Sequence, residues 1–418
     1  MKVYKFGGAS LNGKERIENV AKILSDNKNK QLVVIFSAMG KTTNAMEKVV
    51  DEFYAGNGTK ALQLFDEIKQ NHLQIASKLV SKNLPSLQEQ LLSFFTEVEW
   101  LLHDQPVQSY DYYYDQIVCI GELLSSCIVS SFLNENEVAN TWLDVRDLLR
   151  TDNNFREANI DWKTTTENIE KAGIGNQQKI FVTQGFIGCT DQNESTTLGR
   201  EGSDYTAAIF ANLLNAESLT IWKDVEGVMS ADPKMFSSAT LMSELSFNEV
   251  IEMAFYGAQV IHPKTIKPLQ NKHIPLLVKC FLNPALPGTT ISNTSSMQIP
   301  PIIVLKEKQV LVQMQSQDFS FVGEKPMSRL YELFAELNIR PNLIQTAAIN
   351  IQLCMDDRQE KIDSLCTSAS EIFDVQLQKD LTLLTIRHYT EELLWNMTQG
   401  KNILLTQKTK DTVQVLYS

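Results

Sequence analysis

The chain has 418 residues, of which 43% are hydrophobic and 21% are charged, a composition typical of a globular protein of roughly two or three domains. Its net charge of −12 argues against binding to nucleic acid or to an anionic membrane surface. No signal peptide and no apolar run of membrane-spanning length stand out, and the six cysteines form no CxxC pair. We therefore expect a cytoplasmic protein with reduced thiols and no zinc site.

The first predicted strand, Val3–Phe6, ends in a glycine pair and a hydroxyl. Gly7, Gly8 and Ser10 follow it, and apolar residues at helical spacing come next. Backbone N–H groups in such a turn, before a helix, can cradle a phosphate. Lys5 lies on the strand end, where its ammonium can point at the same phosphates. The spacing is not that of a Walker A loop, so the turn alone also fits a structural role.

A second predicted strand, 31–36, ends in hydroxyl-bearing residues at another helix start. Ser37 and Thr43 belong to this run. The next region, 45–103, is helical in pattern and predicts a lobe beside the mouth of the site. Tyr112–Tyr114 indicates a helix start or a partly buried strand, with an interface or lid patch as the alternative.

The segment TTLGREGSDYTAA, residues 196–208, carries the densest polar cluster. Two glycines, a guanidinium, a hydroxyl and a carboxylate fall within six residues: Gly199, Arg200, Gly202, Ser203 and Asp204. A predicted buried strand, 180–183, precedes the cluster, and a helical apolar stripe follows it. Free amides at a helix start favour anions, and Arg200 adds a planar fork suited to a carboxylate or a phosphate. Because ligands bind at the carboxyl ends of strands in open α/β sheets, these strand ends predict one anion-handling active site.

Five motifs, taken together, resemble the aspartokinase family. They are KFGGAS at 5–10, GEL at 121–123, the segment 196–208, IWKDVEGV at 221–228 with ADP at 231–233, and GAQVIHP at 257–263. The match extends from Met1 to Cys280 and continues more weakly beyond. The resemblance implies a three-layer α/β/α amino-acid kinase domain with an open, mostly parallel sheet over 1–290. It also implies an α+β regulatory region of two ferredoxin-like ACT-type units, the second one short, over 299–418.

The resemblance implies transfer of the γ-phosphoryl group of MgATP to the β-carboxylate of L-aspartate, the first step towards lysine, threonine and methionine. An aspartate side chain, with a pKa near ~3.9, is already an anionic nucleophile at neutral pH, so no general base is required. The difficulty is to bring two anions together and to stabilise the charge on the transferring group. Lys, Mg²⁺ and backbone amides meet that need. His262 precedes Pro263, and we interpret it as structural.

By resemblance, Lys5 would stabilise the transition state, and Asp204 would organise Lys5 or the metal end of the site. Arg200 would clamp the α-carboxylate of aspartate, and Glu122 would hold its amino group. From the residues alone, Glu122 fits a helix-dipole role equally well. The substrate carboxylates would be positioned by Ser37, Thr43 and Ser203. The nucleotide would be bound by Gly7, Gly8, Ser10, Lys223, Asp224, Met229, Lys234, Gln259 and Val260. Mg²⁺ would be held mainly by the ATP phosphates.

Several positions depart from the aspartokinase pattern. Family members commonly have Thr at Lys223, Tyr at Met229, Arg at Lys234, Gly at Glu201 and Lys at Gln259. The cationic side chains are rearranged rather than lost, so ATP remains the expected nucleotide.

The region beyond a Ser/Thr/Asn-rich linker at 292–296 predicts short strands alternating with helices. The predicted strands are 309–314, near 343, 349–353, near 375, 381–386, 403–405 and 413–416; the predicted helices are near 328–337, 360–370 and through 394. We expect this region to serve homodimerisation and regulation, with an amino acid as the candidate effector.

Lysine-responsive aspartokinases usually carry a Ser-Glu pair after a Thr in the first ACT unit. Here Ala347 and Ala348 follow Thr346. Two alanines cannot pair with a lysine ligand, and losing a buried carboxylate partner commonly costs on the order of 2–5 kcal/mol. We therefore expect weak or absent inhibition by lysine, with threonine sensitivity or dimerisation alone as alternatives.

Two rival functions compete with this hypothesis. Another amino-acid kinase would act on glutamate, N-acetylglutamate, carbamate or UMP, but Glu122 and the ACT-like region weigh against it. The departures at Glu201, Met229 and Gln259 leave some room for a non-catalytic amino-acid sensor. The retained Lys5 and Arg200 argue against a sensor, which has no need of a transition-state lysine. From the length of 418 residues, we expect no fused homoserine dehydrogenase.

Overall fold

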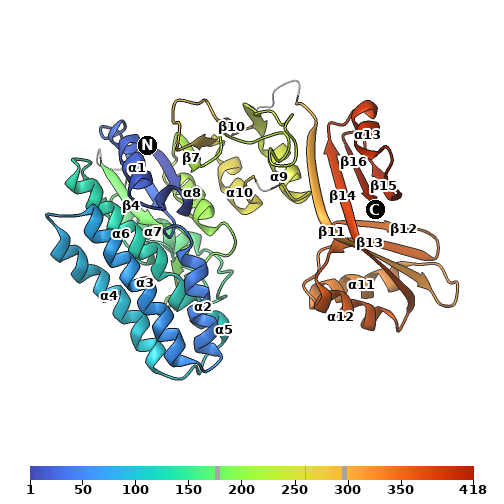
Figure 1. The fold of residues 1–418 in the computed structure, drawn as a ribbon, viewed down its shortest axis with the longest axis horizontal. Helices are drawn as coiled ribbons and strands as arrows, with labels where there is room; N and C mark the ends of the chain where they lie inside the picture. The colour runs from blue at the N-terminus through green and yellow to red at the C-terminus, as the bar shows by residue number, and fades with distance from the viewer. Residues whose placement is uncertain (175–178, 259, 294–298) are drawn as a thin grey trace. The chain divides into compact units, whose positions relative to one another are not determined.

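The computed structural model describes all 418 residues except 175–178, 259 and 294–298, and Figure 1 labels its elements. Contacts divide the chain into two units. The first comprises Met1–Val228, Leu241–Ile251 and Gln259–Met297, and the second comprises Met229–Thr240, Glu252–Ala258 and Gln298–Ser418. Two short segments that precede residue 290 thus group with the C-terminal part of the chain. The predicted domain boundaries at 290 and 299 stay a prediction, and most of the predicted linker lies outside the described residues.

An eight-stranded sheet in the order β3-β4-β2-β1-β7-β9-β10-β8 forms the centre of the first unit. Its strands are β1 Lys2–Phe6, β2 Leu32–Phe36, β3 Asn140–Trp142, β4 Ile180–Gln184, β7 Ser218–Lys223, β8 Glu244–Ser246, β9 Leu276–Cys280 and β10 Thr289–Ser292. Among the strand pairs described, only β9–β10 is antiparallel. Every residue of β2 and β4 is buried, as expected for parallel strands covered on both faces. The predicted open, mostly parallel α/β sheet is confirmed.

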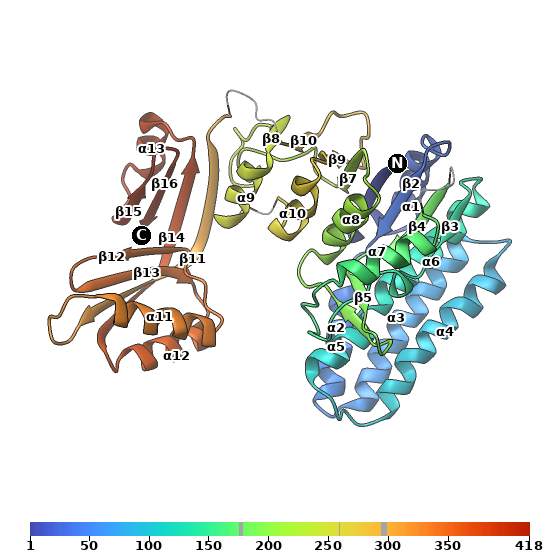
Figure 2. The ribbon, with the colours of Figure 1, turned by 180° about the vertical axis from the view of Figure 1, so that it is seen from behind.

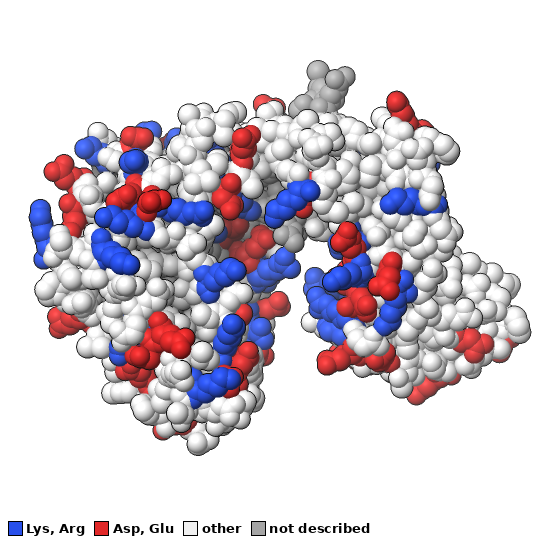
Figure 3. All heavy atoms as spheres, viewed as in Figure 1, with Lys and Arg blue, Asp and Glu red and all other residues white. Residues whose placement is uncertain are grey.

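Helices connect these strands. They are η1 Gly8–Leu11, α1 Lys14–Ser25, α2 Thr42–Tyr54, α3 Gly58–Leu79, α4 Leu84–His103, α5 Tyr110–Val118, α6 Ile120–Glu135, η2 Val145–Asp147, α7 Trp162–Lys171, α8 Gly202–Leu213, α9 Phe247–Phe255 and α10 Pro263–Asn271. Helices α2, α3 and α4 confirm the predicted helical region at 45–103, and α3 packs against both α2 and α4. Figure 2 shows the same helices from behind. Acidic and basic side chains are interspersed on the face shown in Figure 3.

The segment Tyr110–Glu135, which contains α5 and α6, is long and apolar enough to cross a membrane by length and composition. This corrects the expectation that no apolar run approaches that length. The expectation failed because Ser and Tyr residues interrupt the apolar residues of this segment. Within the protein, 89% of its most apolar window is buried. Helix α6 packs against β2, β3 and β4. The segment therefore has the surroundings of a core helix pair.

A two-stranded hairpin, β5 Ile187–Cys189 and β6 Ser195–Thr197, intervenes between β4 and α8. The polar cluster at 198–204 therefore follows β6 and not the buried strand β4, contrary to the sequence expectation. The two are nevertheless close, because a Cβ at Gly185, just after β4, would lie 2.5 Å from the Cβ of Ser203. The glycine lets the start of α8 return to the end of β4.

The second unit contains a six-stranded sheet in the order β12-β13-β11-β14-β16-β15. Its elements are β11 Ile302–Ser316, α11 Glu324–Glu336, β12 Leu343–Thr346, β13 Asn350–Asp356, α12 Gln359–Ala369, β14 Phe373–Arg387, α13 Glu391–Thr398, β15 Ile403–Lys408 and β16 Thr412–Tyr417. Two separate strands were expected near 375 and at 381–386. The structure shows one continuous strand, β14, so this expectation is wrong.

The long strands β11 and β14 are shared by two ferredoxin-like arrangements. The order β14-β11-β13-β12 with α11 and α12 is that of a complete ferredoxin-like unit. Beyond a pair of register shifts around Gln309, the first part of β11 pairs with the last part of β14. That part of β14 continues into α13, β15 and β16, which gives a second arrangement with one helix. The two units are thus interleaved, which the sequence pattern did not predict.

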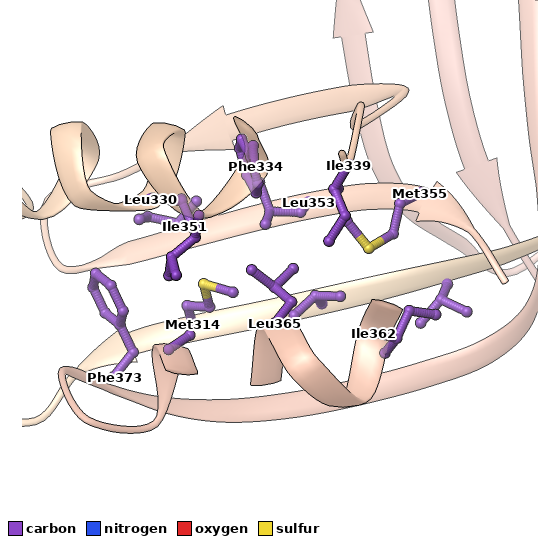
Figure 4. Close-up of a cluster of buried hydrophobic side chains, with 14 residues drawn as sticks. Met314, Leu330, Phe334, Ile339, Ile351, Leu353, Met355, Ile362, Leu365 and Phe373 are labelled. Atoms are coloured by element: carbon purple, nitrogen blue, oxygen red, sulfur yellow. The ribbon is translucent and has the colours of Figure 1, made fainter. Parts of the chain in front are cut away.

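The complete unit has its own apolar core, shown in Figure 4. Met314 of β11 and Leu353 of β13 are fully buried beneath the two helices. Leu330 of α11 and Leu365 of α12 are 1% and 0% exposed and project into the same cluster. The apolar face of the two helices and the apolar face of the sheet therefore pack against each other in one core.

Candidate active site

The predicted site residues of the first unit gather at one edge of the sheet. Strands β4, β2, β1 and β7 are parallel neighbours, so their carboxyl ends lie side by side. Lys5 lies near the end of β1, Ser37 follows β2, Gly185 follows β4 and Lys223 ends β7. Pairing continues past the strands, since the Ser37 N–H donates to the Phe6 carbonyl at 3.1 Å. This edge is where an open α/β sheet binds its ligands.

Lys5 and Asp204 form a buried ion pair at the centre of this edge. Lys5 Nζ lies 2.7 Å from Asp204 Oδ1, and the side chains are 12% and 4% exposed. Asp204 comes from the first turn of α8, where a carboxylate also complements the helix dipole. A Cβ at Gly7 would lie 3.4 Å from Lys5 Nζ, so bare backbone faces the ammonium. The pair holds Lys5 beside the glycine turn.

The glycine turn after β1 packs tightly on the turn after β2. A Cβ at Gly8 would lie 2.7 Å from the Ala38 carbonyl oxygen and 2.8 Å from that of Gly40. The Gly40 N–H donates to the Gly8 carbonyl at 3.0 Å. Ser10 is buried, and its hydroxyl donates to the Gly7 carbonyl at 2.6 Å. The hydroxyl of Ser10 therefore closes the turn in this structure.

Glu122 lies in the first turn of α6 and is 3% exposed. Its Oε2 atom has no hydrogen-bond partner among the described residues. Burial raises its pKa to about 8, against the opposing effects of the backbone N–H groups of Ala38 and Glu122 and of the Lys5 charge. Helix α6 meets the turn after β2 closely, since a Cβ at Gly121 would lie 3.1 Å from the Ala38 Cβ. A buried acid without a full set of partners is thus placed near Lys5.

The predicted substrate-binding residues share the same edge but differ in exposure. Ser203 is 8% exposed, whereas Ser37 and Thr43 are partly exposed. Arg200 is exposed, and within the described part of the chain its side chain makes no hydrogen bond or ion pair. Its guanidinium is free to meet a ligand.

Glu201, next to Arg200, adopts a left-handed backbone conformation with φ of 54°. Its Oε2 accepts a hydrogen bond from the His262 N–H at 2.9 Å. The His262 ring in turn accepts from the Lys264 N–H and caps α10. His262 is thus a helix cap, in line with its structural interpretation.

The predicted nucleotide-binding residues are only partly brought together. Lys223 Nζ donates to the Val260 carbonyl at 2.7 Å, which joins two of them, and Asp224 is exposed beside Lys223. Met229 and Lys234 belong to the segment that groups with the second unit, so the first unit does not place them at the site. Gln259 lies outside the described residues.

Asp115 of α5 is a functional candidate that the sequence reasoning missed. It is fully buried, and its carboxylate accepts from the Thr197 N–H at 2.8 Å, the Thr197 hydroxyl at 2.7 Å and the Arg156 N–H at 2.9 Å. Burial raises its pKa to about 6, against the effect of these hydrogen bonds. The available signal was an acid within an otherwise apolar helical segment, seven residues before Glu122.

The sequence profile of the amino acid kinase family matches residues 1–280. A bifunctional aspartokinase/homoserine dehydrogenase 1 from Zea mays chloroplasts is 32% identical over 293 residues, which are 69% of this chain and 32% of that protein. The chain thus spans about a third of the length of such plant relatives. Lysine-sensitive aspartokinase 3 of Escherichia coli K12 is 29% identical over 395 residues, covering 92% of this chain and 86% of that protein.

Solved structures agree with these sequence matches. E. coli aspartokinase III in complex with aspartate and ADP has a TM-score of 0.83 and 26% identity, covering 100% of this chain and 96% of that one. The same enzyme in complex with lysine and aspartate has a TM-score of 0.82 at 26% identity, covering 100% and 95%. Clostridium acetobutylicum aspartate kinase shares the fold, with a TM-score of 0.80 at 20% identity and coverage of 100% and 96%.

Proposed function

Because the chain belongs to the amino acid kinase family, we propose that it is an aspartate kinase. It would transfer the γ-phosphoryl group of ATP to the β-carboxylate of L-aspartate and so form 4-phospho-L-aspartate, which opens the route to lysine, threonine and methionine. The observation that carries this proposal is the buried Glu122 with its unpartnered Oε2, near the Lys5–Asp204 ion pair. The aspartokinase names of relatives that span most of the chain support it.

Lys5 would stabilise the transferring phosphoryl group. Its ammonium is held by Asp204 and faces the bare backbone of Gly7. A cation fixed in this way meets developing charge without having to reorganise. The acceptor carboxylate is already ionised at neutral pH and needs no base. Catalysis then consists mainly of positioning and of electrostatic stabilisation.

Glu122 would recognise the ammonium group of aspartate. With a pKa raised to about 8 by burial, the free enzyme holds this acid largely protonated at neutral pH. An incoming ammonium favours the ionised form and supplies the missing partner for Oε2. Arg200 would bind the α-carboxylate through its planar fork, with Ser203, Ser37 and Thr43 lining the same edge. A substrate that carries an ammonium and a carboxylate at the right separation would bind Glu122 and Arg200 at the same time.

ATP would place its phosphates on the glycine turn, with Lys223 and Val260 near the nucleoside. Mg²⁺ neutralises phosphate charge in such reactions. Within the described residues, no three His, Cys, Asp or Glu side chains gather to hold a metal ion. We propose that the ATP phosphates would supply most of its ligands and that Asp204 would organise Lys5 or the metal end of the site.

We propose that the ACT-type region serves homodimerisation and regulation, and that lysine inhibits weakly or not at all. A cavity of about 270 Å³ in the second unit is lined by the loop from Ser316 to Val322 and by residues 371–373. The Val322 N–H donates to the Ala348 carbonyl at 2.8 Å, so the Ala347–Ala348 pair adjoins this loop. Neither alanine offers a side-chain partner to an ammonium.

ADP release with alternative acceptors tests the proposed function. We expect turnover with L-aspartate and little with glutamate, N-acetylglutamate or UMP. Lys5→Ala should lower kcat by about 10²–10³-fold, the loss typical of removing one fixed transition-state partner. Lys14→Ala removes an exposed lysine of α1 and serves as the control. Turnover with another acceptor alone would overturn the substrate, and binding of aspartate without turnover would favour a sensor.

A further inference from the structure

The loop 198–201, which carries Arg200, depends on neighbouring backbone for its position. It begins after β6, where the Leu198 N–H donates to the Phe186 carbonyl at 2.9 Å, and it ends where the Gly202 N–H donates to the Gly199 carbonyl at 3.0 Å. Because Arg200 has no side-chain partner in the described part of the chain, its direction follows from the backbone of this loop.

A second segment lies against the same loop. The Ala158 N–H donates to the Thr197 carbonyl at 3.0 Å. A Cβ at Gly199, which has φ of 77°, would lie 3.2 Å from the Arg156 carbonyl oxygen. Arg156 itself has φ of 69°, a conformation that a non-glycine residue keeps only when its surroundings fix it. The position of Arg200 therefore rests on Thr197 and Arg156.

Asp115 accepts hydrogen bonds from both Thr197 and Arg156. Its Oδ2 accepts from the backbone N–H groups of Thr197 and Arg156, and its Oδ1 accepts from the Thr197 hydroxyl. Buried amides that lose their acceptor pay the full cost of desolvation, so this carboxylate is difficult to replace. The reaction derived above does not use it.

We propose that Asp115 is a positioning residue for substrate binding: through Thr197 and Arg156 it fixes the 198–201 loop so that Arg200 meets the carboxylate of the acceptor. The inference rests on the proposed function for the identity of that acceptor. Asp115 acts through the loop and touches neither substrate.

The test compares Asp115→Ala with Asp115→Asn. Alanine removes all three acceptor contacts, and we expect the KM for aspartate to rise roughly tenfold while kcat and the KM for ATP change less than about twofold. Asparagine can place its oxygen on the two amides and donate its NH₂ to the Thr197 hydroxyl, so it should restore the KM to within about threefold. This rescue distinguishes hydrogen bonding from charge.

Asp161→Ala is the matched control, because Asp161 also accepts three hydrogen bonds, from Lys163 and Thr164, but caps α7 away from the loop. It should lower stability without moving either KM. Hydrogen exchange gives a second readout, with the Thr197 and Leu198 amides exchanging faster in Asp115→Ala only.

Equal losses for aspartate and ATP in Asp115→Ala, or unchanged exchange at residues 197–201, would overturn the inference. If Asp115→Ala does not fold, Thr197→Val removes the hydroxyl contact alone, and an unchanged KM for aspartate would then count against it. If the wild-type enzyme does not turn over aspartate, the proposed function fails, while exchange at the loop still decides the role of Asp115.

Discussion

At the scale of single residues, the ionisation of Glu122 links substrate affinity to pH. Burial raises its pKa to about 8, and the ammonium of aspartate requires the ionised form. We therefore expect the KM for aspartate to fall as the pH rises from 6 to 8. In Glu122→Gln the KM should rise at least tenfold at pH 8, since removing one buried charged partner typically costs about 2–5 kcal/mol, and its pH dependence should disappear.

Steady-state kinetics across this pH range provide the measurement. Glu135→Gln, at the exposed end of the same helix, is the control and should behave as wild type towards aspartate. A pH-dependent KM that survives in Glu122→Gln would show that another group recognises the ammonium.

The same buried acid should destabilise the free enzyme at higher pH. Its pKa in the folded state lies above the unfolded value of about 4.3, so the fold loses stability as the pH rises from that value through about 8. Glu122→Gln removes this loss. We expect its Tm to exceed that of wild type at pH 8, with a smaller difference at pH 5. Thermal melts without substrate measure it, and a lower Tm for the variant at pH 8 would contradict the buried, unpaired acid.

At the scale of elements, the turns after β1 and β2 form one interlocked unit that only glycine permits. In Gly8→Ala the new Cβ would meet two carbonyl oxygens at 2.7 and 2.8 Å, so the turns must separate. We expect a loss of about 1–3 kcal/mol of stability, typical of overpacking, together with a higher KM for ATP. Gly58→Ala at the start of α3 meets nothing closer than 3.8 Å and should be neutral or slightly stabilising. Equal Tm values for the two variants would refute the interlocked turns.

Some elements of the fold could be predicted from the sequence, and others could not. The strand Leu32–Phe36 follows from a continuous apolar run, and the helices of 45–103 follow from helical periodicity, because both signals are local in the sequence. The hairpin 187–197 was missed because its two strands have only three residues each. Asp115 was missed because its partners, Thr197 and Arg156, are distant in sequence, and no local sequence pattern predicts these contacts. The buried state of Glu122 likewise depends on tertiary packing against Ala38.

At the scale of the whole molecule, the interleaving of the two ferredoxin-like arrangements could not be predicted from the sequence. Short strands can be recognised one by one, but the pairing of the first part of β11 with the last part of β14 joins residues about 80 positions apart. The shared strands make the C-terminal part of the chain one sheet. Removal of β15 and β16 would therefore be expected to disturb β11 as well.

Regulation by lysine is also a property of the whole molecule. With alanines at 347 and 348, we expect no inhibition below about 1 mM lysine, because an ammonium loses tenfold or more in affinity without its carboxylate partner. A lysine titration of the aspartate-dependent activity, with threonine and methionine in parallel, measures this. Half-maximal inhibition at sub-millimolar lysine would contradict it and would point to a different set of contacts for the effector.

The most direct test of the proposed reaction is the identity of its product. Purified protein, ATP, Mg²⁺ and L-aspartate would be incubated with hydroxylamine, and the trapped hydroxamate would be identified by mass spectrometry. We predict aspartate β-hydroxamate in amounts equal to the ADP released, and about 10²–10³-fold slower formation with Lys5→Ala. ADP release without the hydroxamate, or a hydroxamate formed only from another acid, would contradict phosphoryl transfer to aspartate.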